Sequence, residues 1–184
     1  MTEATASQQQ RSAGTDVADE ANQYLTFSVA EERLAMPIDA VQEIIETPQI
    51  TQVPMTPDYI RGVINLRGNV VPIVDLAARL NRGAATLSKR SCIVVVEVES
   101  NRSSYVFGML VDEVKNILDI PRENVRPAPT FGSDISTDFI QAMGRVEDVF
   151  VIILAINHVL SVQELAELQK MTEGASLSVP EVGG

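Results

Sequence analysis

Arg67 and Glu43 are the two charged residues whose surroundings suggest a specific binding chemistry. Arg67 is part of the turn Arg67-Gly68-Asn69, which lies between two runs of β-forming residues. Gly68 and Asn69 tolerate the positive φ angles that a tight turn requires, so the turn lifts the guanidinium group away from the strands. Glu43 lies between apolar neighbours in another predicted strand. A guanidinium fork matches a carboxylate in geometry, so the two groups can form an ion pair beside apolar binding area.

The sequence also allows a simpler interpretation of both residues. Arg67 can be a surface arginine that only marks a hairpin, and Glu43 can be an exposed carboxylate that never meets it. Exposed charge pairs contribute little free energy even when they form. The residue types and their spacing alone favour this second interpretation.

Residues suited to catalysis or metal binding are scarce in this chain. His158 is the single histidine and Cys92 the single cysteine, which argues against a metal site built from these residue types. We expect a surface or capping role for His158, and Cys92 opens an apolar strand as a small buried hydrophobe. Glu97 and Glu99 share one side of that strand, which is typical of a solvated face. Phosphate-loop and dinucleotide-binding spacings are absent. We therefore expect no enzymatic activity, no cofactor and no metal.

The composition indicates a folded protein of modest size. The chain of 184 residues is long enough for one domain or two small, closely packed ones, and 45% of its residues are hydrophobic. No apolar run approaches the length of a membrane span, and residues 1–22 contain no apolar segment typical of a secretory signal. With a single cysteine, an intramolecular disulfide is excluded. We expect a cytoplasmic protein.

Basic residues are concentrated in one segment of an acidic chain. The net charge is −11, yet residues 61–90 hold six basic residues against one acid, Asp75. A local positive segment suits either a nucleic acid or an acidic face of a partner protein. Aromatic residues make up only 4% of the chain and tryptophan is absent, so platforms for base stacking are few. The composition favours the acidic protein partner.

Hydrophobic alternation predicts a series of short strands separated by turns. The expected strands are residues 24–29, 34–36, 41–46, 63–66, 70–74, 92–98, 104–111 and 149–156. The last of these is almost continuously apolar, so we expect it to be buried on both faces.

Two helices are predicted by their start signals. Thr56 is a suitable N-cap and Pro57 suits the first helical position, so we expect a one-turn helix that Gly62 closes. The run Ser-Val-Gln-Glu at 161–164 forms a capping box, which opens a C-terminal helix ending near Met171.

The second half of the chain repeats features of the first. Residues 112–118 resemble residues 39–45, and residues 137–140 resemble residues 57–60. Self-similarity at this long spacing indicates two copies of one small β module. Many short strands with closely spaced turns are typical of barrels rather than of a parallel sheet. The sequence therefore predicts a mainly β protein.

The run Gly62–Leu76, which reads Gly-Val-Ile-Asn-Leu-Arg-Gly-Asn-Val-Val-Pro-Ile-Val-Asp-Leu, resembles the signature of the CheW family of bacterial chemotaxis coupling proteins. A second marker of that family is the run Val125–Pro129, and the resemblance extends from about Gln23 to Gln169. It implies two intertwined five-stranded SH3-like barrels with short helical turns and a C-terminal helix. We expect one CheW-like domain made of two barrel subdomains over residues 23–171, between a flexible N-terminal tail (1–22) and a flexible C-terminal tail (172–184).

The resemblance also implies a function without catalysis. CheW proteins are adaptors that couple the cytoplasmic tips of transmembrane chemoreceptors to the regulatory domain of the histidine kinase CheA. We accordingly expect a cytoplasmic scaffold that receptor arrays recruit to the inner face of the membrane without insertion. Two alternatives stay in view. One is a CheW-like adaptor of another chemosensory array, such as one for pilus motility, and the other is a barrel that binds nucleic acid or a small ligand.

Interface positions follow from the resemblance by motif match. Three residues match the receptor-facing strand region and Arg67 matches the turn that supports it, so the Glu43–Arg67 ion pair becomes the favoured interpretation. Three further residues match positions near the same functional surfaces, without assignment to one partner. The expected receptor- or kinase-interface residues are Val41, Glu43, Ile44, Gly62, Arg67, Gly108 and Ile117.

Overall fold

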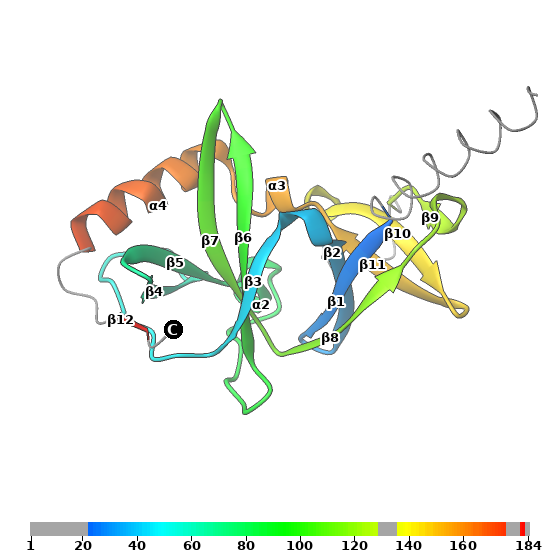
Figure 1. Ribbon diagram of the computed structural model, residues 1–184, viewed down its shortest axis with the longest axis horizontal. Coiled ribbons are helices and arrows are strands. Elements are labelled where there is room, and N and C mark those ends of the chain that lie inside the picture. Colours follow the sequence, from blue (N-terminus) through cyan, green and yellow to red (C-terminus); the bar gives the residue numbers. More distant parts are fainter. Residues whose placement is uncertain (1–21, 129–135, 176–180, 183–184) are drawn as a thin grey trace, which may run out of the picture.

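Two curled β-sheets lie side by side in the structure, a computed structural model that describes residues 22–128, 136–175 and 181–182 (Figure 1). Barrel 1 has the strand order β8-β1-β2-β11-β10-β9, and barrel 2 has the order β12-β4-β5-β7-β6-β3. Within the described residues, each barrel contains five strands of at least six residues and one strand of two residues. The mainly β architecture predicted from the sequence is confirmed.

All eight predicted strands are present with bounds that differ by up to three residues, and the described residues contain four more strands, β8, β9, β10 and β12. The strands of barrel 1 are β1 (Gln23–Val29), β2 (Glu32–Pro37), β8 (Glu113–Asp119), β9 (Val125–Arg126), β10 (Ile140–Val146) and β11 (Val149–Leu154). The strands of barrel 2 are β3 (Val41–Glu46), β4 (Ile60–Leu66), β5 (Asn69–Asp75), β6 (Cys92–Ser100), β7 (Ser103–Val111) and β12 (Glu181–Val182). The helical segments are η1 (Ile38–Ala40), α2 (Leu76–Arg79), η2 (Arg122–Asn124), η3 (Thr137–Phe139), α3 (Ile156–Val159) and α4 (Val162–Ala175).

The two barrels share one topology and exchange strands with each other. The order β8-β1-β2-β11-β10 matches the order β3-β6-β7-β5-β4, and in each barrel two hairpins meet along one parallel pair, β2–β11 or β5–β7. The equivalent strands β3 and β8 contain the repeated runs 39–45 and 112–118 in large part. Strand β3 follows the β1–β2 hairpin in the chain but pairs with β6, whereas β8 follows the β6–β7 hairpin but pairs with β1. The barrels are therefore intertwined.

The central strands are apolar on both faces because each face packs against a different neighbour. Successive side chains of a strand point to opposite faces. In β6, Val94 belongs to a core shared by both barrels, whereas Val95 points into barrel 2. In β11, Ile152 belongs to the shared core and Ile153 fills barrel 1. The two barrels therefore have separate interiors and one common core between them.

Asp75 fixes the start of α2 at the junction of the barrels. This buried carboxylate accepts hydrogen bonds from the backbone N–H groups of Ala78 (3.2 Å) and Ala85 (2.9 Å), and Arg61 lies 3.6 Å from it. The first bond is an N-cap, because the side-chain oxygen satisfies an N–H group without a partner inside the helix. The second hydrogen bond, from Ala85, fixes the position of the segment that follows α2.

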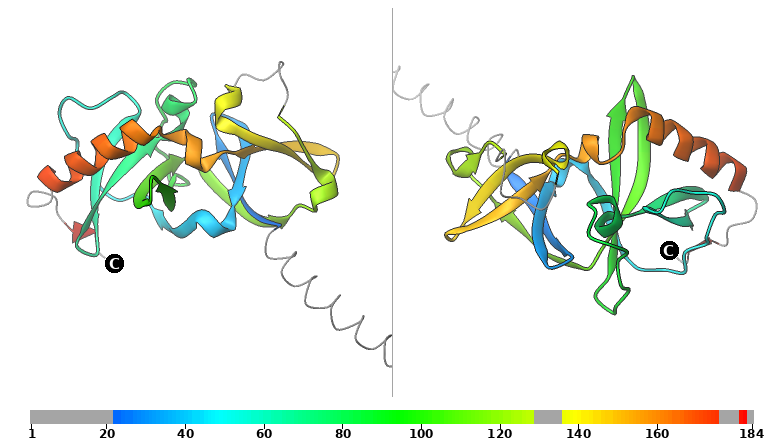
Figure 2. Two further views of the ribbon diagram at one scale, coloured as in Figure 1. Left: turned by 90° about the horizontal axis from the view of Figure 1, so that it is seen from above. Right: turned by 180° about the vertical axis from the view of Figure 1, so that it is seen from behind.

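Helix α4 begins at the predicted capping box and runs along barrel 2 (Figure 2). The Ser161 N–H donates to Glu164 Oε1 (2.7 Å), and the Glu164 N–H donates to Ser161 Oγ (3.1 Å). This reciprocal pair is the geometry that the sequence pattern predicts. Leu165 and Leu168 are buried against the shared core, so the apolar stripe of the helix packs on the barrels.

Two local predictions are wrong. Residues 56–61 form no helix: Gly62 lies inside β4, at an irregularity in its pairing with β5, and the Thr56 hydroxyl donates to the Val53 carbonyl (3.1 Å) instead of capping a helix. The strand at 149–156 ends at Leu154, and only residues 151–154 are buried throughout, because Val149 and Phe150 are 50% and 57% exposed.

The predicted tails fall partly outside the described residues. Of residues 1–22, the structure describes only Asn22. Within 172–184, residues 172–175 continue α4 beyond its predicted end, and the two residues of β12 pair in parallel with Asn65 and Leu66 of β4.

Candidate functional site

The turn between β4 and β5 presents Arg67 as the sequence predicts, with one difference in backbone conformation. Positive φ angles occur at Arg67 (53°) and Gly68 (86°) rather than at Gly68 and Asn69. The Asn65 side chain stabilises the turn, since its Oδ1 accepts a hydrogen bond from the Gly68 N–H (2.9 Å). Two successive residues in the left-handed region are characteristic of the tight hairpin turn that matches strand twist.

Arg67 and Glu43 form a two-pronged ion pair. The Arg67 Nη1 and Nη2 groups donate to Glu43 Oε1 (2.5 Å) and Oε2 (2.9 Å), respectively. The hydrogen bond from Arg67 is the main reason that the pKa of Glu43 is lowered, and the Arg67 pKa is raised by the same bond. The pair is solvent-accessible, with side chains 63% and 26% exposed. The structure therefore favours the ion pair over two charges that never meet.

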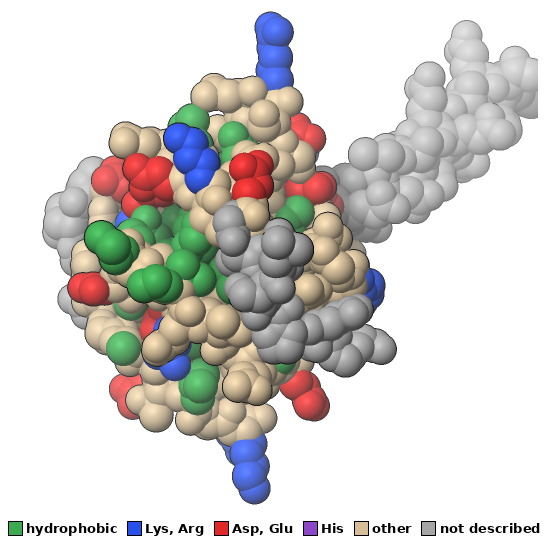
Figure 3. Space-filling model, turned by 90° about the vertical axis from the view of Figure 1, so that its left-hand side faces the viewer, with side chains coloured by type: hydrophobic (Ala, Val, Ile, Leu, Met, Phe, Trp, Pro, Cys, Tyr) green, Lys and Arg blue, Asp and Glu red, His purple; other side chains and the backbone are tan. Residues whose placement is uncertain are grey.

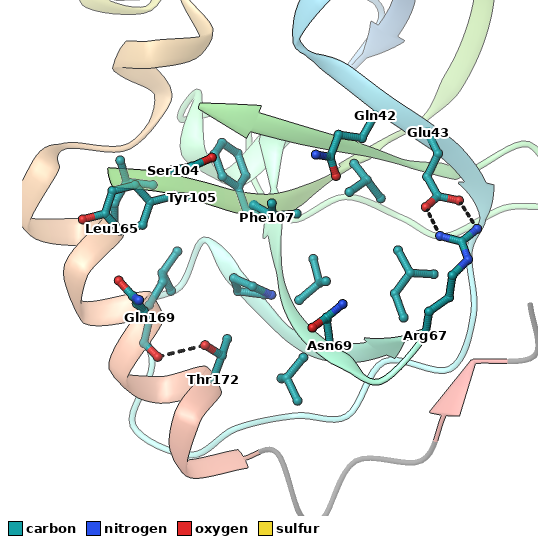
Figure 4. Close-up of a pocket in the computed structure, with 17 residues that line it drawn as sticks. Gln42, Glu43, Arg67, Asn69, Ser104, Tyr105, Phe107, Leu165, Gln169 and Thr172 are labelled. Carbon is teal, nitrogen blue, oxygen red and sulfur yellow. Dashed lines mark hydrogen bonds and ion pairs between the residues drawn. The ribbon is translucent and has the colours of Figure 1, made fainter. Parts of the chain in front are cut away.

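A groove of about 430 Å³ lies beside this ion pair on barrel 2. Figure 4 shows the Glu43–Arg67 pair on one side of the groove and α4 on the other, with strand residues between them. The apolar part of its lining includes Val70, Pro72, Val95, Phe107, Leu165 and Leu168. Figure 3 shows hydrophobic side chains gathered on this end of the molecule, with charged side chains around them. A groove that combines apolar and polar lining residues with a fixed charge pair at its edge is suited to binding a protein surface.

Ile44 and Ile117 occupy equivalent positions on a different surface. Ile44 in β3 is 41% exposed and Ile117 in β8 is 54% exposed. Their strand partners are Val94 and Leu25, respectively, and both partners belong to the shared core. Because directly opposed residues of an antiparallel pair lie on the same face, both isoleucines extend the shared core toward solvent. Val41, opposite Val96, packs on the same core.

Gly62 and Gly108 lie inside barrel 2 rather than on its surface. A Cβ atom on Gly62, whose φ is +141°, would lie 2.2 Å from the Thr51 carbonyl oxygen. A Cβ on Gly108 would lie 2.6 Å from Ile93 and 2.7 Å from Ile73. Both positions exclude a side chain, because the neighbouring backbone or core already fills that space. Of the seven predicted residues, the structure therefore brings Glu43 and Arg67 into direct contact and buries these two glycines.

The side chains considered for enzymatic chemistry lie on α3 and β6. His158 is exposed on α3, and Glu97 and Glu99 lie on the exposed face of β6. Burial raises the pKa of the half-buried Cys92 thiol, which disfavours a reactive thiolate. Across the described residues, no cluster of three or more His, Cys, Asp or Glu side chains is placed to hold a metal ion. Nor does any described helix have the length and apolar character needed to cross a membrane.

Sequence reasoning missed the contribution of α4 and β7 to the groove. Leu165 and Leu168 lie on one face of the helix that the capping box predicts, but nothing in their spacing indicates which surface they pack against. Tyr105 and Phe107 of β7 also line the groove. Their alternation predicted a strand, and their place in the groove follows from the pairing of β7 with β5, which local patterns do not encode.

Comparison with known proteins agrees with this geometry. The family model described as the CheW-like domain matches residues 23–164, which is well over half of the chain. The chain belongs to the CheW-like family. This membership confirms the family indicated by the signature run at 62–76, and the match includes β3, the β4–β5 turn and the start of α4.

Individual members of the CheW-like family match over most of their length. Chemotaxis protein CheW of Klebsiella aerogenes is 33% identical over 144 residues, which cover 78% of this chain and 84% of the relative. Protein FrzA of Myxococcus xanthus is 31% identical over 131 residues, covering 69% and 79%. The crystal structure of the scaffolding protein TtCheW from Thermoanaerobacter tengcongensis is 31% identical, with a TM-score of 0.69 and coverage of 78% and 90%. The likeness to that structure confirms the predicted CheW fold.

Proposed function

We propose that this protein is a non-catalytic adaptor that couples transmembrane chemoreceptors to the histidine kinase CheA. Its membership of the CheW-like family supports this function, as do similar proteins named chemotaxis protein CheW and a similar structure described as a scaffolding protein. The adaptor works in the cytoplasm, and receptor arrays recruit it to the inner face of the membrane.

The Glu43–Arg67 ion pair beside the groove is the observation that carries the proposal. The pair holds both side chains in one orientation before a partner arrives, so less conformational entropy is lost on binding. The groove supplies apolar area, and an arginine at the edge of such an area is a frequent hot spot. Val41, Ile44 and Ile117 provide a second apolar surface beside the shared core. Gly62 and Gly108 support barrel 2 from inside without meeting a partner.

An adaptor of another chemosensory array is the second candidate. The similarity to FrzA, at 31% identity, supports it, because that relative does not carry the CheW name. Both candidates require the same groove and differ in the receptors and the kinase that the protein joins. A comparison of binding to the two kinase types distinguishes them.

The pairing of the basic residues argues against a nucleic-acid ligand. Five of the six basic residues in 61–90 have a carboxylate within 4 Å. These pairs are Arg61–Asp75, Arg67–Glu43, Arg79–Glu164, Arg82–Glu32 and Arg90–Glu113. A phosphate backbone is bound by basic groups that are free to neutralise it. The positive character of this segment is therefore largely neutralised within the fold.

Co-sedimentation tests the proposed function directly. The full chain is mixed with receptor-containing membranes, with purified CheA, and with both together. We expect the protein to sediment with the membranes and to increase the amount of CheA that sediments with them. If the protein binds neither partner while a fluorescently labelled oligonucleotide does bind, the adaptor function is wrong. Membranes without receptors are the control for direct attachment to lipid.

A further inference from the structure

The side chain of Arg79 lies over the rings of two equivalent aromatic residues where the barrels meet. The centre of the Arg79 guanidinium group lies 4.6 Å from the ring centroid of Tyr59 and 5.3 Å from that of Phe139. Tyr59 precedes β4 and Phe139 precedes β10, so they occupy matching places in the repeated runs 57–60 and 137–140. A cation over a ring face is attracted to the ring, so both rings attract the guanidinium group. Arg79 thus contacts one element of each barrel.

The polar contacts of Arg79 also cross between equivalent elements. Arg79 is the last residue of α2, and its Nε donates to the carbonyl oxygen of Val159, the last residue of the matching helix α3 (2.7 Å). Its Nη2 donates to Glu164 Oε1 (2.8 Å). The side chains of Arg79 and Glu164 are only 19% and 22% exposed, respectively. Their charges are therefore screened much less than those of an ion pair on the surface.

Glu164 receives enough hydrogen bonds to fix the start of α4. Besides Arg79, its carboxylate accepts from the Tyr59 hydroxyl (2.7 Å) and from the Ser161 N–H (2.7 Å). Donors therefore reach it from α2, from the segment before β4, and from its own capping box. Tyr59 and Arg79 both belong to the part of the chain adjoining barrel 2, so this network ties the first turn of α4 to that barrel.

The next turns of α4 form one wall of the groove. Leu165 directly follows Glu164, and Leu168 and Gln169 line the groove one turn further along the helix. A helix anchored at its first turn transmits any rotation or shift of that turn to the following turns, because its backbone is rigid. The shape of the groove therefore depends on contacts made outside it.

We propose that Arg79 is a positioning residue that holds α4 in place as a wall of the groove and thereby sets the affinity for the protein bound there. This inference rests on the proposed adaptor function for the identity of the partner. Arg79 does not line the groove. Its effect on binding is consequently indirect, which separates it from Arg67 at the groove edge.

Two variants of the full chain test the position of α4. Arg79→Lys keeps the charge but loses the planar fork and its contact with the two rings. Tyr59→Phe removes one hydroxyl and keeps the ring beside Arg79, so it provides a milder change that is compatible with folding. Arg145→Lys is the matched control, because Arg145 forms an exposed pair with Asp148 (2.6 Å) away from the groove.

Amide hydrogen exchange and binding are measured on the same samples. We expect faster exchange in α4 but unchanged exchange in β6 for Arg79→Lys and, to a smaller extent, for Tyr59→Phe. Binding is titrated against CheA and against receptor tips. We define the groove partner as the one of these two proteins whose binding is weakened by Arg67→Ala. For that partner we expect affinity to fall by about tenfold in Arg79→Lys and to be unchanged in Arg145→Lys.

Three results would overturn the inference. Unchanged exchange in α4 would mean that Arg79 does not hold the helix. Faster exchange in β6 as well as α4 would indicate a general loss of stability. Faster exchange in α4 with unaltered binding would mean that the position of the helix does not affect the partner. Binding of the unmodified protein to each partner is measured before any variant is compared. Failure to bind either partner would contradict the proposed function rather than the role of Arg79.

Discussion

Arg67 and Glu43 join the two ends of one curled sheet. Arg67 follows β4, the long strand at one end of barrel 2, whereas Glu43 lies in β3, the strand at the opposite end. The ion pair therefore bridges strands that are far apart in the sheet order. The outer side of β4 is itself paired with Thr51 and with β12, so the ion pair adds a side-chain link between the two strands rather than covering an open edge. The same two residues thus contribute to barrel closure and to the surface of the groove.

The first prediction concerns this ion pair. Arg67→Ala and Glu43→Ala should each weaken binding of the groove partner by about tenfold or more, because both remove a preorganised charge from the edge of an apolar area. The unfolding temperature should change little, since the pair is exposed. Titration calorimetry and thermal unfolding measure the two effects.

The double variant decides whether the two residues act together. If the ion pair is the functional unit, the loss in binding free energy of the double variant should be smaller than the sum of the single losses. Strictly additive losses would show two independent contacts, and normal binding of both single variants would remove this surface from the site.

The second prediction compares two glycines that both have positive φ angles. Gly62→Ala should destabilise the protein by about 3 kcal/mol or more, because two costs add together. The new Cβ clashes with the Thr51 backbone, and alanine is strained at the positive φ of this position. Gly83→Ala is the control: its φ is +84° but nothing lies within 4 Å, so only the backbone cost of about 1 kcal/mol is expected. Urea unfolding measures both, and equal losses would contradict the close approach of Thr51.

The third prediction is a loss of stability in acid. Burial alone would raise the pKa of Glu164, but hydrogen bonds from Ser161 and Tyr59 and the charge of Arg79 lower it overall. A carboxyl group whose pKa is lower in the folded state stabilises the fold above its unfolded pKa, near 4.3, and this contribution disappears as the pH falls through the folded pKa. The unfolding temperature should therefore decrease below about pH 4.5.

Glu164→Gln provides the comparison for the acid effect. This variant cannot lose a carboxylate at position 164, so its unfolding temperature should be lower at pH 7 and should depend less on pH between about 3 and 5. Thermal unfolding of both proteins over this range gives the slopes. Parallel curves would mean that Glu164 does not contribute to the pH dependence.

The fourth prediction follows from the exchange of strands between the barrels. Residues 23–171 should unfold in one cooperative transition, because neither barrel is complete without segments from both halves of the chain and the two share a core. Calorimetry should give equal calorimetric and van't Hoff enthalpies. Two resolved transitions, each assigned to one barrel, would contradict the single domain.

Local sequence patterns predicted eight of the twelve described strands, because alternation and turn residues are local properties. The turn at Arg67 and the capping box at Ser161 were both found at the expected residues. The helix predicted from Thr56 and Pro57 was wrong because long-range pairing overrides its start signal: Thr51 pairs with Val63, and β4 already begins at Ile60. A matching signal at Ser136 does cap a short helical turn, η3.

The candidate site was predictable only where a residue carries its own motif. Glu43 and Arg67 were identified from a short run and a family signature, and their contact is present in the structure. The place of Leu165 in the groove and the contacts of Arg79 with Tyr59 and Phe139 depend on how distant elements pack. No spacing in the sequence specifies such packing, although the repeated runs 57–60 and 137–140 did mark the two rings as equivalent.

The exchanged strands give the two barrels different times of completion during synthesis. All long strands of barrel 2 are available once the ribosome has passed Val111. Barrel 1 begins first, with β1 and β2, but Leu34 of β2 can pair with Ile152 only after β11 has been synthesised. The nascent β1–β2 hairpin must therefore keep its apolar residues from aggregating while more than half of the protein is translated. We expect the N-terminal β1–β2 hairpin, although it is synthesised first, to be the last part of the chain to fold.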